Sequence, residues 1–268
     1  MTAATTVMSP ARARRTLAGP AVPRIVAGVA ILVFWEAVVR AFAPDFVAKP
    51  SAVVAAIPRV LSSTSFLASA WITVAATLEG LFAALVLGTA IGLLMGRSVA
   101  ADRLLRLWVN VFNAMPMIIV LPLMSLWFGY TSMARLATVI FAAIFAVIVN
   151  AAEGARAVPR DYVEVARAFR SSPLRVVFEI VLPAATPYLL AGFRLAAGRA
   201  LIGAVVAEFF TAIPGLGYFI LFNSRTYHQN KAFVAVLLLA AFGVGFNALV
   251  DWSTRRFLPW YRRDEIRE

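Results

Sequence analysis

Residues 80–96 read GLFAALVLGTAIGLLMG, an apolar run with a small residue at every fourth position. The small residues are Gly80, Ala84, Gly88, Gly92 and Gly96. Positions four apart lie on one face of an α-helix, so the run predicts a stripe along which a second helix backbone can approach closely. Close packing of this kind is the main attraction between helices in lipid, where every surface is apolar. The run therefore predicts a membrane-spanning helix that packs through its small residues.

The composition of the whole chain agrees with a location in the lipid bilayer. Of its 268 residues, 62% are hydrophobic and only 14% are charged, and the mean hydropathy is +0.85. A water-soluble domain has far more charge than this. The absence of cysteine and the single histidine, His228, leave few ligands for a metal and no thiol nucleophile. We expect no metal and no cofactor bound by this chain, and we attribute the net charge of +12 to its loops and not to nucleic-acid binding.

Six apolar runs are long enough to cross a bilayer, which takes about 20 helical residues. They are residues 25–42, 70–95, 104–128, 134–152, 187–210 and 233–250. None alternates with the period of two that barrel strands require, so the runs predict an all-α, six-span fold. The membrane domain then covers 25–250, between a basic tail at 1–24 and a second tail at 251–268. Pro116 and Pro122 in the third run predict a kink or an interruption.

Lysine and arginine are distributed unevenly between alternate connections. Of the 25 such residues, 17 lie in the two tails, the second-to-third connection and the fourth-to-fifth connection, against five on the opposite side. The excess of positive charge marks the cytoplasmic side of a membrane protein. We therefore predict a multi-pass protein of the cell (inner) membrane with both termini cytoplasmic. The first run contains Glu36 and is expected to be an uncleaved helix, not a signal peptide.

The cytoplasmic connection 153–186 predicts a helix, a turn and a second helix. Asp161 and Glu164 form a capping-box-like start for a short helix over 162–170, and Ser172 with Pro173 predicts the start of another. One face of the first helix is apolar, formed by Tyr162, Val165, Ala166 and Phe169. A nine-residue helix does not persist alone in water, so this face is expected to dock on the rest of the chain or on a partner. The pattern does not decide between the two.

Residues 164–183 read EVARAFRSSPLRVVFEIVLP. This segment resembles the EAA-x3-G-x9-I-x-LP loop of the membrane subunits of binding-protein-dependent ABC importers. Five positions are in register: Glu164, Ala166, Ile180, Leu182 and Pro183. Val165 replaces the usual second alanine and Arg170 occupies the glycine position. Further segments are similar to the subgroup that handles nitrate, sulfonates, taurine and other small solutes; they lie at 49–51, 122–130, 182–210, 214–220 and 255–260.

The resemblance implies partner proteins and a source of free energy for transport. A separate ABC ATPase subunit would bind the short helix through Tyr162, Glu164, Val165, Ala166, Arg167, Phe169 and Arg170. A second permease copy would complete the pathway as a homodimer, and an extracytoplasmic substrate-binding protein would deliver the solute. ATP would be used by the partner, because this chain has no G-x-x-x-x-G-K-[ST] loop to hold it. The implied function is the import of a small anion such as a sulfonate, taurine or nitrate by alternating access.

Charged and polar residues inside the spans are candidates for the pathway, because each is costly to place in lipid. Glu36 and Arg40 are expected to pair on one helix face. The candidate pathway residues are Asn113, Met117, Asn150, Arg194, Arg199 and Glu208. An arginine at one of these positions would either assist the passage of an anion or form a pair with a side chain of another helix. The PGLGYFI segment at 214–220 would form a gate or an ordinary Pro-Gly turn.

Other functions are consistent with the hydropathy alone. A permease of the same family could carry a different solute, such as a vitamin precursor. A membrane-embedded enzyme would need acids, histidines or metal ligands clustered at the membrane surface, and no such cluster is evident in the sequence. A passive channel or scaffold would leave the short cytoplasmic helix without a purpose.

Overall fold

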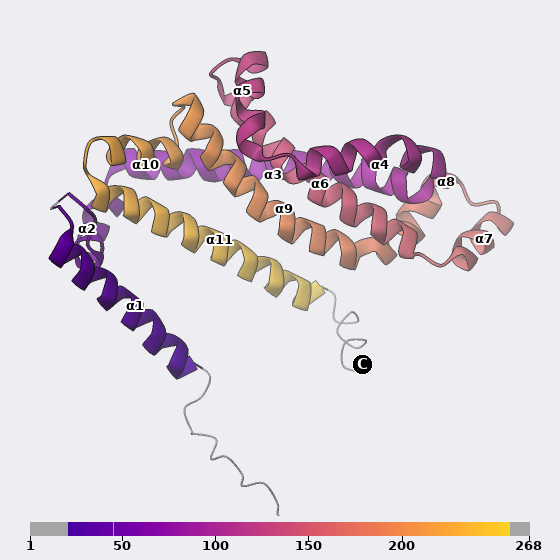
Figure 1. The fold of residues 1–268 in the computed structure, drawn as a ribbon. Helices are drawn as coiled ribbons and strands as arrows, with labels where there is room; N and C mark the ends of the chain where they lie inside the picture. Colours follow the sequence, from indigo (N-terminus) through magenta and orange to yellow (C-terminus); the bar gives the residue numbers. More distant parts are fainter. Residues whose placement is uncertain (1–20, 45, 258–268) are drawn as a thin grey trace, which may run out of the picture.

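The computed structural model describes residues 21–44 and 46–257, and every regular element in these two ranges is a helix. Figure 1 shows long helices lying side by side in an elongated body, with α1 splayed away from it. The helices are α1 (Ala21–Phe42), α2 (Pro50–Leu61), α3 (Thr64–Arg97), α4 (Val99–Ala114), α5 (Met117–Phe128), α6 (Ser132–Ala157), α7 (Arg160–Ala168), α8 (Pro173–Val176), the π-helix η1 (Val177–Val181), α9 (Leu182–Thr211), α10 (Leu216–Arg225) and α11 (Gln229–Phe257). The all-α prediction is confirmed.

Helices α3, α6 and α9 form the centre of the fold. The glycine stripe of α3 packs on α6 along its whole length: a Cβ added at Gly88 would lie 2.8 Å from Cβ of Val147, and one at Gly92 would lie 2.6 Å from the carbonyl oxygen of Ile148. The numbers rise together along both helices, so α3 and α6 run in the same direction. Gly192 of α9 meets Asn150 of α6, and α9 runs the opposite way. The small-residue packing predicted for the second span is confirmed.

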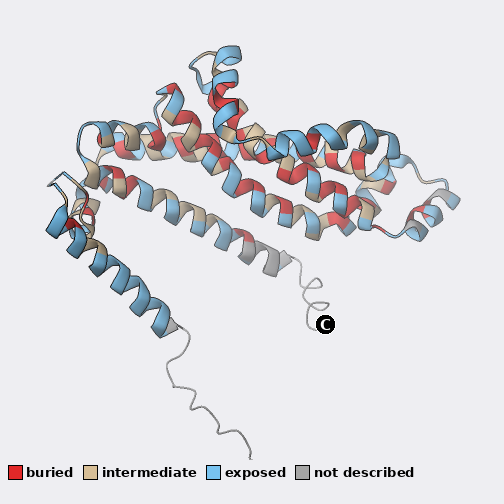
Figure 2. Cartoon of the chain, viewed as in Figure 1, coloured by how far each residue is buried: buried red, intermediate tan, exposed pale blue. Residues whose placement is uncertain are grey.

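A second packing centre joins α2, α3, α10 and α11 at one end of the molecule. Phe66 and Leu216 are fully enclosed there, together with Val53, Val60 and Val234. In contrast, α1 is exposed along nearly all of its length, as Figure 2 shows in pale blue. An exposed helix that is as apolar as α1, with a hydropathy of 2.1 over Val22–Phe42, presents a surface suited to lipid. The core of this chain therefore consists of α3, α6 and α9, with α1 at the margin.

The third predicted span is not one helix. It divides into α4 and α5, which meet at an angle of 104°. Pro116 is the N-cap of α5 and lies in the extended region with φ −61° and ψ 127°, so the helix cannot continue through it. Pro122 lies inside α5, which continues through it from Met117 to Phe128. Five of the described helices are therefore long and apolar enough to cross a membrane, or six if α4 and α5 together form one bent span.

Two helices were not among the predicted spans, namely α2 and α10. Pro50 stands in the first turn of α2, where its missing N–H costs nothing. Pro58 lies inside the same helix, and a proline at an interior position argues against a helix when the sequence is considered alone. The predicted spans are otherwise recovered with longer ends, because the helices continue past the apolar runs. The predicted tails fall largely on residues 1–20 and 258–268, which lie outside the described residues.

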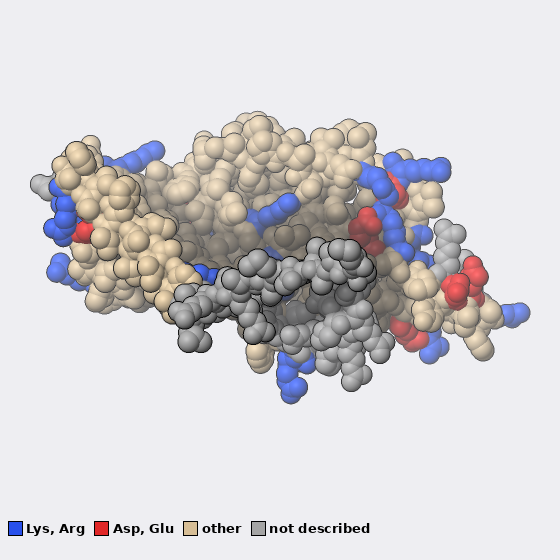
Figure 3. All heavy atoms as spheres, turned by 60° about the horizontal axis from the view of Figure 1, so that its bottom comes forward, with Lys and Arg blue, Asp and Glu red and all other residues tan. Residues whose placement is uncertain are grey.

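Charged side chains are concentrated at the two ends of the molecule. On the face drawn in Figure 3, most of the Lys, Arg, Asp and Glu side chains gather toward the two ends, and a few Lys or Arg side chains lie between them. One end contains α7, α8 and the start of α4. The other contains α2 and α10. A broad apolar band between two charged ends is the form expected of a protein that crosses a bilayer.

Candidate functional site

The short helix α7 is attached to the rest of the chain by one side. It begins at Arg160, so Asp161 lies in its first turn and is not the N-cap that the capping-box pattern predicted. Val163 and Ala166 are buried in a cluster with Ala155, Val158, Val176 and Val181. The helix ends at Ala168, two residues before the predicted end at Arg170. These contacts fix how α7 is rotated against α6 and η1.

The opposite side of α7 is apolar and uncovered. Tyr162, Val165 and Phe169 are 62%, 56% and 81% exposed. The predicted apolar face is therefore divided: Ala166 packs inward and the three larger side chains face away from the chain. Glu164 is exposed and lines the cavity described below, while Arg167 lies on α7 with a side chain outside the described part. Three large apolar side chains between residues 162 and 169, on α7 and directly after it, form a surface suited to a partner.

The turn after α7 places Arg170 in a left-handed conformation with φ 55°. The amide of Ser171 donates to the carbonyl of Ala166 at 3.0 Å, and the amide of Phe169 donates to Val165 at 3.1 Å. The bond from Ser171 to Ala166 is the long bond of a Schellman motif, in which glycine usually occupies the left-handed position. Arg170 therefore adopts the backbone shape that the importer motif assigns to glycine, without having a glycine.

The second predicted helix start is confirmed. The Ser172 hydroxyl accepts from the amide of Arg175 at 3.3 Å, and Pro173 is the first residue of α8. The four residues of α8 continue into η1 and then into α9 without a break. A short turn at residues 169–172 therefore connects α7 to a helical segment that runs without a break into the long central helix α9.

An ion network lies beside α7, at the junction of α4 and α6. Asp102 accepts from Arg106 at 3.0 Å and from Arg156 at 2.5 Å, and Arg156 also pairs with Glu153 at 2.5 Å. Asp102 and Arg156, together with Glu164 of α7, line a cavity of about 580 Å³. Because Asp102 is on α4 and Arg156 is on α6, the network holds the two helices together at the end where α7 is attached.

Three of the candidate pathway residues lie around one cavity in the middle of the molecule. Asn113, Met117 and Arg199 line a space of about 180 Å³ where α4 ends, α5 begins and α9 passes. The Arg199 guanidinium donates from Nη1 to Oδ1 of Asn113 at 2.6 Å. The two residues are separated by 86 positions in the sequence, so their pairing is a result of the fold.

The other three candidates lie elsewhere. Asn150 bonds back to the carbonyl of Ala146 at 2.8 Å and packs against Gly192, at the contact between α6 and α9. Arg194 is exposed on α9, five positions before Arg199. Glu208 has no exposed surface. The structure therefore gathers only half of the candidate pathway residues, and Glu208 belongs to a closed network at the other end of the molecule.

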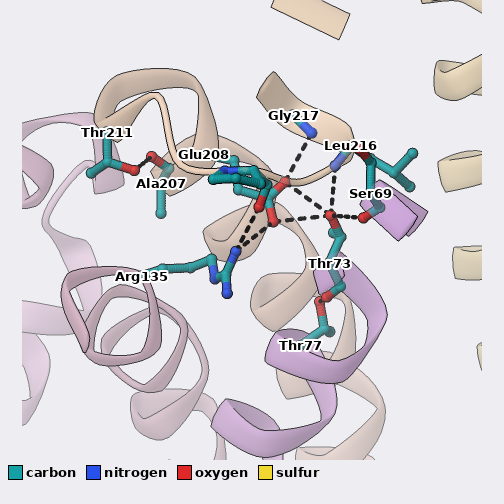
Figure 4. Close-up of polar contacts among 10 residues, drawn as sticks. Ser69, Thr73, Thr77, Arg135, Ala207, Glu208, Thr211, Leu216 and Gly217 are labelled. Carbon is teal, nitrogen blue, oxygen red and sulfur yellow. Dashed lines mark hydrogen bonds and ion pairs between the residues drawn. The ribbon is translucent and has the colours of Figure 1, made fainter. Parts of the chain in front are cut away.

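The Glu208 network joins four helices, as Figure 4 shows. Its carboxylate accepts from the amide of Gly217 at 2.8 Å and from the Thr73 hydroxyl at 2.9 Å, and Arg135 lies 3.5 Å away. Arg135 is 9% exposed and also donates to the carbonyl of Pro214 at 2.9 Å. The hydroxyl of Thr73 in turn accepts from the amide of Leu216 at 2.7 Å. The PGLG segment is thus held by residues of α3, α6 and α9.

Sequence reasoning missed Thr73, Arg135 and Asp102. A buried acid in a span needs partners, so Glu208 itself signalled that donors lie nearby, but the identity of those donors depends on packing between distant segments. The local pair of Glu36 with Arg40 is confirmed at 2.6 Å. Glu36 also accepts from the amide of Ser51 at 3.0 Å and so satisfies a free donor at the start of α2.

Comparison with known proteins gives one family and several relatives. A family profile described as "Binding-protein-dependent transport system inner membrane component" matches residues 80–263. A putative aliphatic sulfonates transport permease of Bacillus subtilis (strain 168) is 33% identical over 65% of this chain and 63% of its own length. A formylaminopyrimidine transport permease of Halalkalibacterium halodurans is 26% identical over 87% of this chain and 93% of its own length. The chain thus spans less than two thirds of the sulfonate relative.

The fold also matches a solved structure. Inward facing conformations of the MetNI methionine ABC transporter include a chain that superposes with a TM-score of 0.62 at 22% identity. The match covers 71% of this chain and 94% of that one. At this identity the likeness concerns the fold alone.

Proposed function

Because the chain belongs to the family of binding-protein-dependent transport system inner membrane components, we propose that it is the permease subunit of an ATP-driven importer for a small solute. Closure of a separate ATPase on ATP would move the helices between inward-facing and outward-facing states. The permease would contribute the pathway and the partner would contribute the energy. Neither role requires chemistry by this chain.

One observation carries the proposal: the exposed apolar face of α7. Tyr162, Val165 and Phe169 point away from a helix that Val163 and Ala166 fix to the core. An ATPase with an apolar groove would cover this face, and movement of α7 would pass through α8 and η1 to α9. The ion network of Asp102 and Arg156 supports the same end of α4 and α6. A rigidly supported docking helix is what a mechanical connection requires.

The proposed solute is a small anion such as a sulfonate, taurine or nitrate. The sulfonate relative and the exposed Arg199 in the middle of α9 support an anion. A second candidate is a formylaminopyrimidine, because the formylaminopyrimidine relative matches over 87% of this chain. A second copy of the permease, forming a homodimer, and an extracytoplasmic substrate-binding protein complete the proposed assembly. The α2 and α10 end would face outward and receive the binding protein, and both termini would be cytoplasmic.

Association with the ATPase tests this proposal most directly. The permease is co-expressed with a candidate ABC ATPase subunit from the same organism, and the complex is purified through a tag on the permease. We expect Phe169→Ala to weaken association by about 2 kcal/mol, roughly 30-fold in dissociation constant, as for a central apolar contact of an interface. Insertion and thermal stability should not change, since Phe169 is 81% exposed.

The matched control is Phe42→Ala, because Phe42 is 86% exposed and belongs to α1, at the end of the molecule that contains α2. It removes the same side chain away from α7 and should leave association intact. Equal association of wild type and Phe169→Ala would refute the role of α7. Uptake of solute into proteoliposomes that proceeds without any ATPase would refute the importer model as a whole.

A further inference from the structure

We propose that the cavity at the α4–α5 break is a solute-binding subsite for a short organic oxyanion, an assignment that rests on the proposed importer function. It is lined by Phe112, Asn113, Met117, Phe141, Phe145 and Arg199. Arg199 and Asn113 bind the oxyanion group, and the three phenylalanines contact the organic part. Neither α7 nor any residue of the Glu208 network contributes to its lining.

The position of Arg199 gives the first argument. It lies near the middle of the 30-residue helix α9, and its side chain is exposed on the surface of this chain. A guanidinium facing hydrocarbon at mid-span costs roughly 2.5 to 3.5 kcal/mol on insertion scales, so such groups face protein or a water-filled cavity. Beside it, Gly198 has nothing within 4 Å of an added Cβ. This face of α9 therefore belongs to an aqueous pathway, where the charge remains solvated.

The bond to Asn113 orients the arginine. Arg199 donates one N–H from Nη1 to Oδ1 of Asn113, and a guanidinium has five N–H groups in total. The planar fork matches an oxyanion with two oxygens, which it binds through paired hydrogen bonds. The amide nitrogen of Asn113 is a further donor beside it. Two donor groups converge at one end of the cavity, and no carboxylate lines it.

Part of the cavity lining is aromatic. Phe141 and Phe145 have ring centroids 5.0 Å apart, and Phe112 lies 6.1 Å and 6.0 Å from them. Met117 adds a flexible thioether at the start of α5. An apolar wall next to a cationic donor pair is the usual form of a pocket for an amphipathic small molecule. It gives no advantage to a purely inorganic anion.

The volume sets the size of the ligand. The cavity measures about 180 Å³, well below the several hundred Å³ of pockets for drug-sized molecules. At roughly 30 Å³ for each water-sized group, it accommodates about six such groups. A two-carbon sulfonate or a carboxylate of similar length fits this limit.

The experiment uses the absence of cysteine from the whole chain, so that a single introduced cysteine is the only thiol. Met117→Cys is placed in the full-length permease in lipid nanodiscs and labelled with N-ethylmaleimide, with ethanesulfonate as the probe. We expect the labelling rate to fall with probe concentration, by roughly tenfold at ten times the dissociation constant, according to the factor 1 + [L]/Kd. Ethyl methyl sulfone, which has a similar size and no charge, should not protect.

Arg199→Gln in the Met117→Cys chain should abolish protection. Asn113→Ala keeps the charge and places the best helix former at an exposed position, so it provides a second variant that is expected to fold and to weaken protection. Tyr130→Cys, at an exposed site after α5, is the control for direct effects of the probe on the reagent. The proposal would be overturned if ethanesulfonate gave no protection, if protection persisted in Arg199→Gln, or if nitrate protected as well as ethanesulfonate does.

The labelling assay contains no ATPase and no ATP, so the two proposals fail separately. If the wild-type complex takes up solute with ATP but ethanesulfonate does not protect Met117→Cys from labelling, the subsite is wrong and the importer function remains supported. Protection at Met117→Cys in a complex that shows no ATP-driven uptake of any solute overturns the importer function.

Discussion

A carboxylate in a membrane-spanning helix is stable only where the protein supplies its hydrogen-bond donors, and Glu208 has three such donors. The amide of Gly217, the hydroxyl of Thr73 and the guanidinium of Arg135 come from three other helices. Gly215 is the N-cap of α10 and has no side chain to cap it. Glu208 and Thr73 therefore perform from α9 and α3 the role that a local N-cap residue normally performs.

Replacement of Gly215 tests this capping arrangement. A Cβ at residue 215 would overlap all three atoms of the Glu208 carboxyl group, which Thr73 and Gly217 hold in place. We expect Gly215→Ala to destabilise the protein by about 1 to 3 kcal/mol, as overpacking of a fixed site does. The measurement is the midpoint of thermal unfolding in nanodiscs.

Gly245→Ala is the matched control, because nothing lies within 4 Å of an added Cβ there and the residue is in α11. It should leave the midpoint unchanged or raise it slightly, since alanine favours helix. If both variants unfold at the wild-type temperature, the carboxyl group is not held as described.

The left-handed Arg170 predicts a second residue effect. A residue with a Cβ loses roughly 1 to 2 kcal/mol in this conformation, and glycine avoids the loss. Arg170→Gly should therefore stabilise the end of α7 and slow hydrogen exchange of its amides by about fivefold for each 1 kcal/mol. Arg170→Ala removes the same charge but keeps the Cβ, and it should exchange as wild type does. A faster exchange in Arg170→Gly would contradict the reading of the turn.

At the scale of the helices, the small-residue stripe of α3 could be predicted from sequence because both its spacing and its apolar surroundings are local properties. Its partner could not, because the matching stripe on α6, which repeats every four residues from Val139 to Ala155, lies 59 positions later and its spacing does not say which two helices pair. The break at Pro116 was predicted only as a kink or an interruption, since proline alone does not fix the angle. The helix α2 was missed because Pro58 contradicts the helical pattern that Pro50 begins.

Gly92→Leu tests the α3–α6 contact. Leucine favours helix, so any loss of stability comes from packing and not from propensity. A Cβ at residue 92 would lie 2.6 Å from the carbonyl oxygen of Ile148 and would also contact Ala151. Both residues belong to α6, which also packs against α9. We expect a loss of at least about 2 kcal/mol, or failure to fold, because small interfaces in lipid depend on close approach. The readout is the yield of monodisperse protein and its thermal midpoint.

The control for this variant is Gly28→Leu in α1, where nothing lies within 4 Å of the added Cβ. It introduces the same side chain on an exposed apolar helix and should be neutral. A Gly92→Leu protein with a wild-type midpoint would show that α3 and α6 separate without cost.

For the candidate site, the sequence supplied the residues but not their grouping. Asn113 and Arg199 were each recognisable as polar residues inside apolar runs, yet they meet only because α9 passes the end of α4, a contact between segments 86 positions apart. Tyr162 and Phe169 were recognisable from helical periodicity. That Ala166 turns inward while its neighbours stay exposed depends on the contact with Val176, which periodicity cannot supply.

At the scale of the whole molecule, the two ends differ in charge and in contacts. The positive-inside count predicts that the α7 end is cytoplasmic, the proposed docking role of α7 predicts the same side, and α11 ends on the same side as α7 in Figure 1. The two criteria are independent, since one counts arginines in loops and the other follows from an exposed docking helix. Both predict that α10 and the Glu208 network lie on the outer side.

Single cysteines test this orientation without any prior substitution, because the wild-type chain has none. Phe169→Cys, at the end of α7, and Tyr227→Cys, after α10, are both well exposed positions. A membrane-impermeant thiol reagent applied to intact spheroplasts should label Tyr227→Cys and leave Phe169→Cys unlabelled, and permeabilised cells should label both. Labelling of Phe169→Cys from outside would place α7 beyond the reach of any cytoplasmic ATPase. The orientation inferred from the charge asymmetry and the docking role of α7 would then both be wrong, because each predicts that α7 lies on the cytoplasmic side.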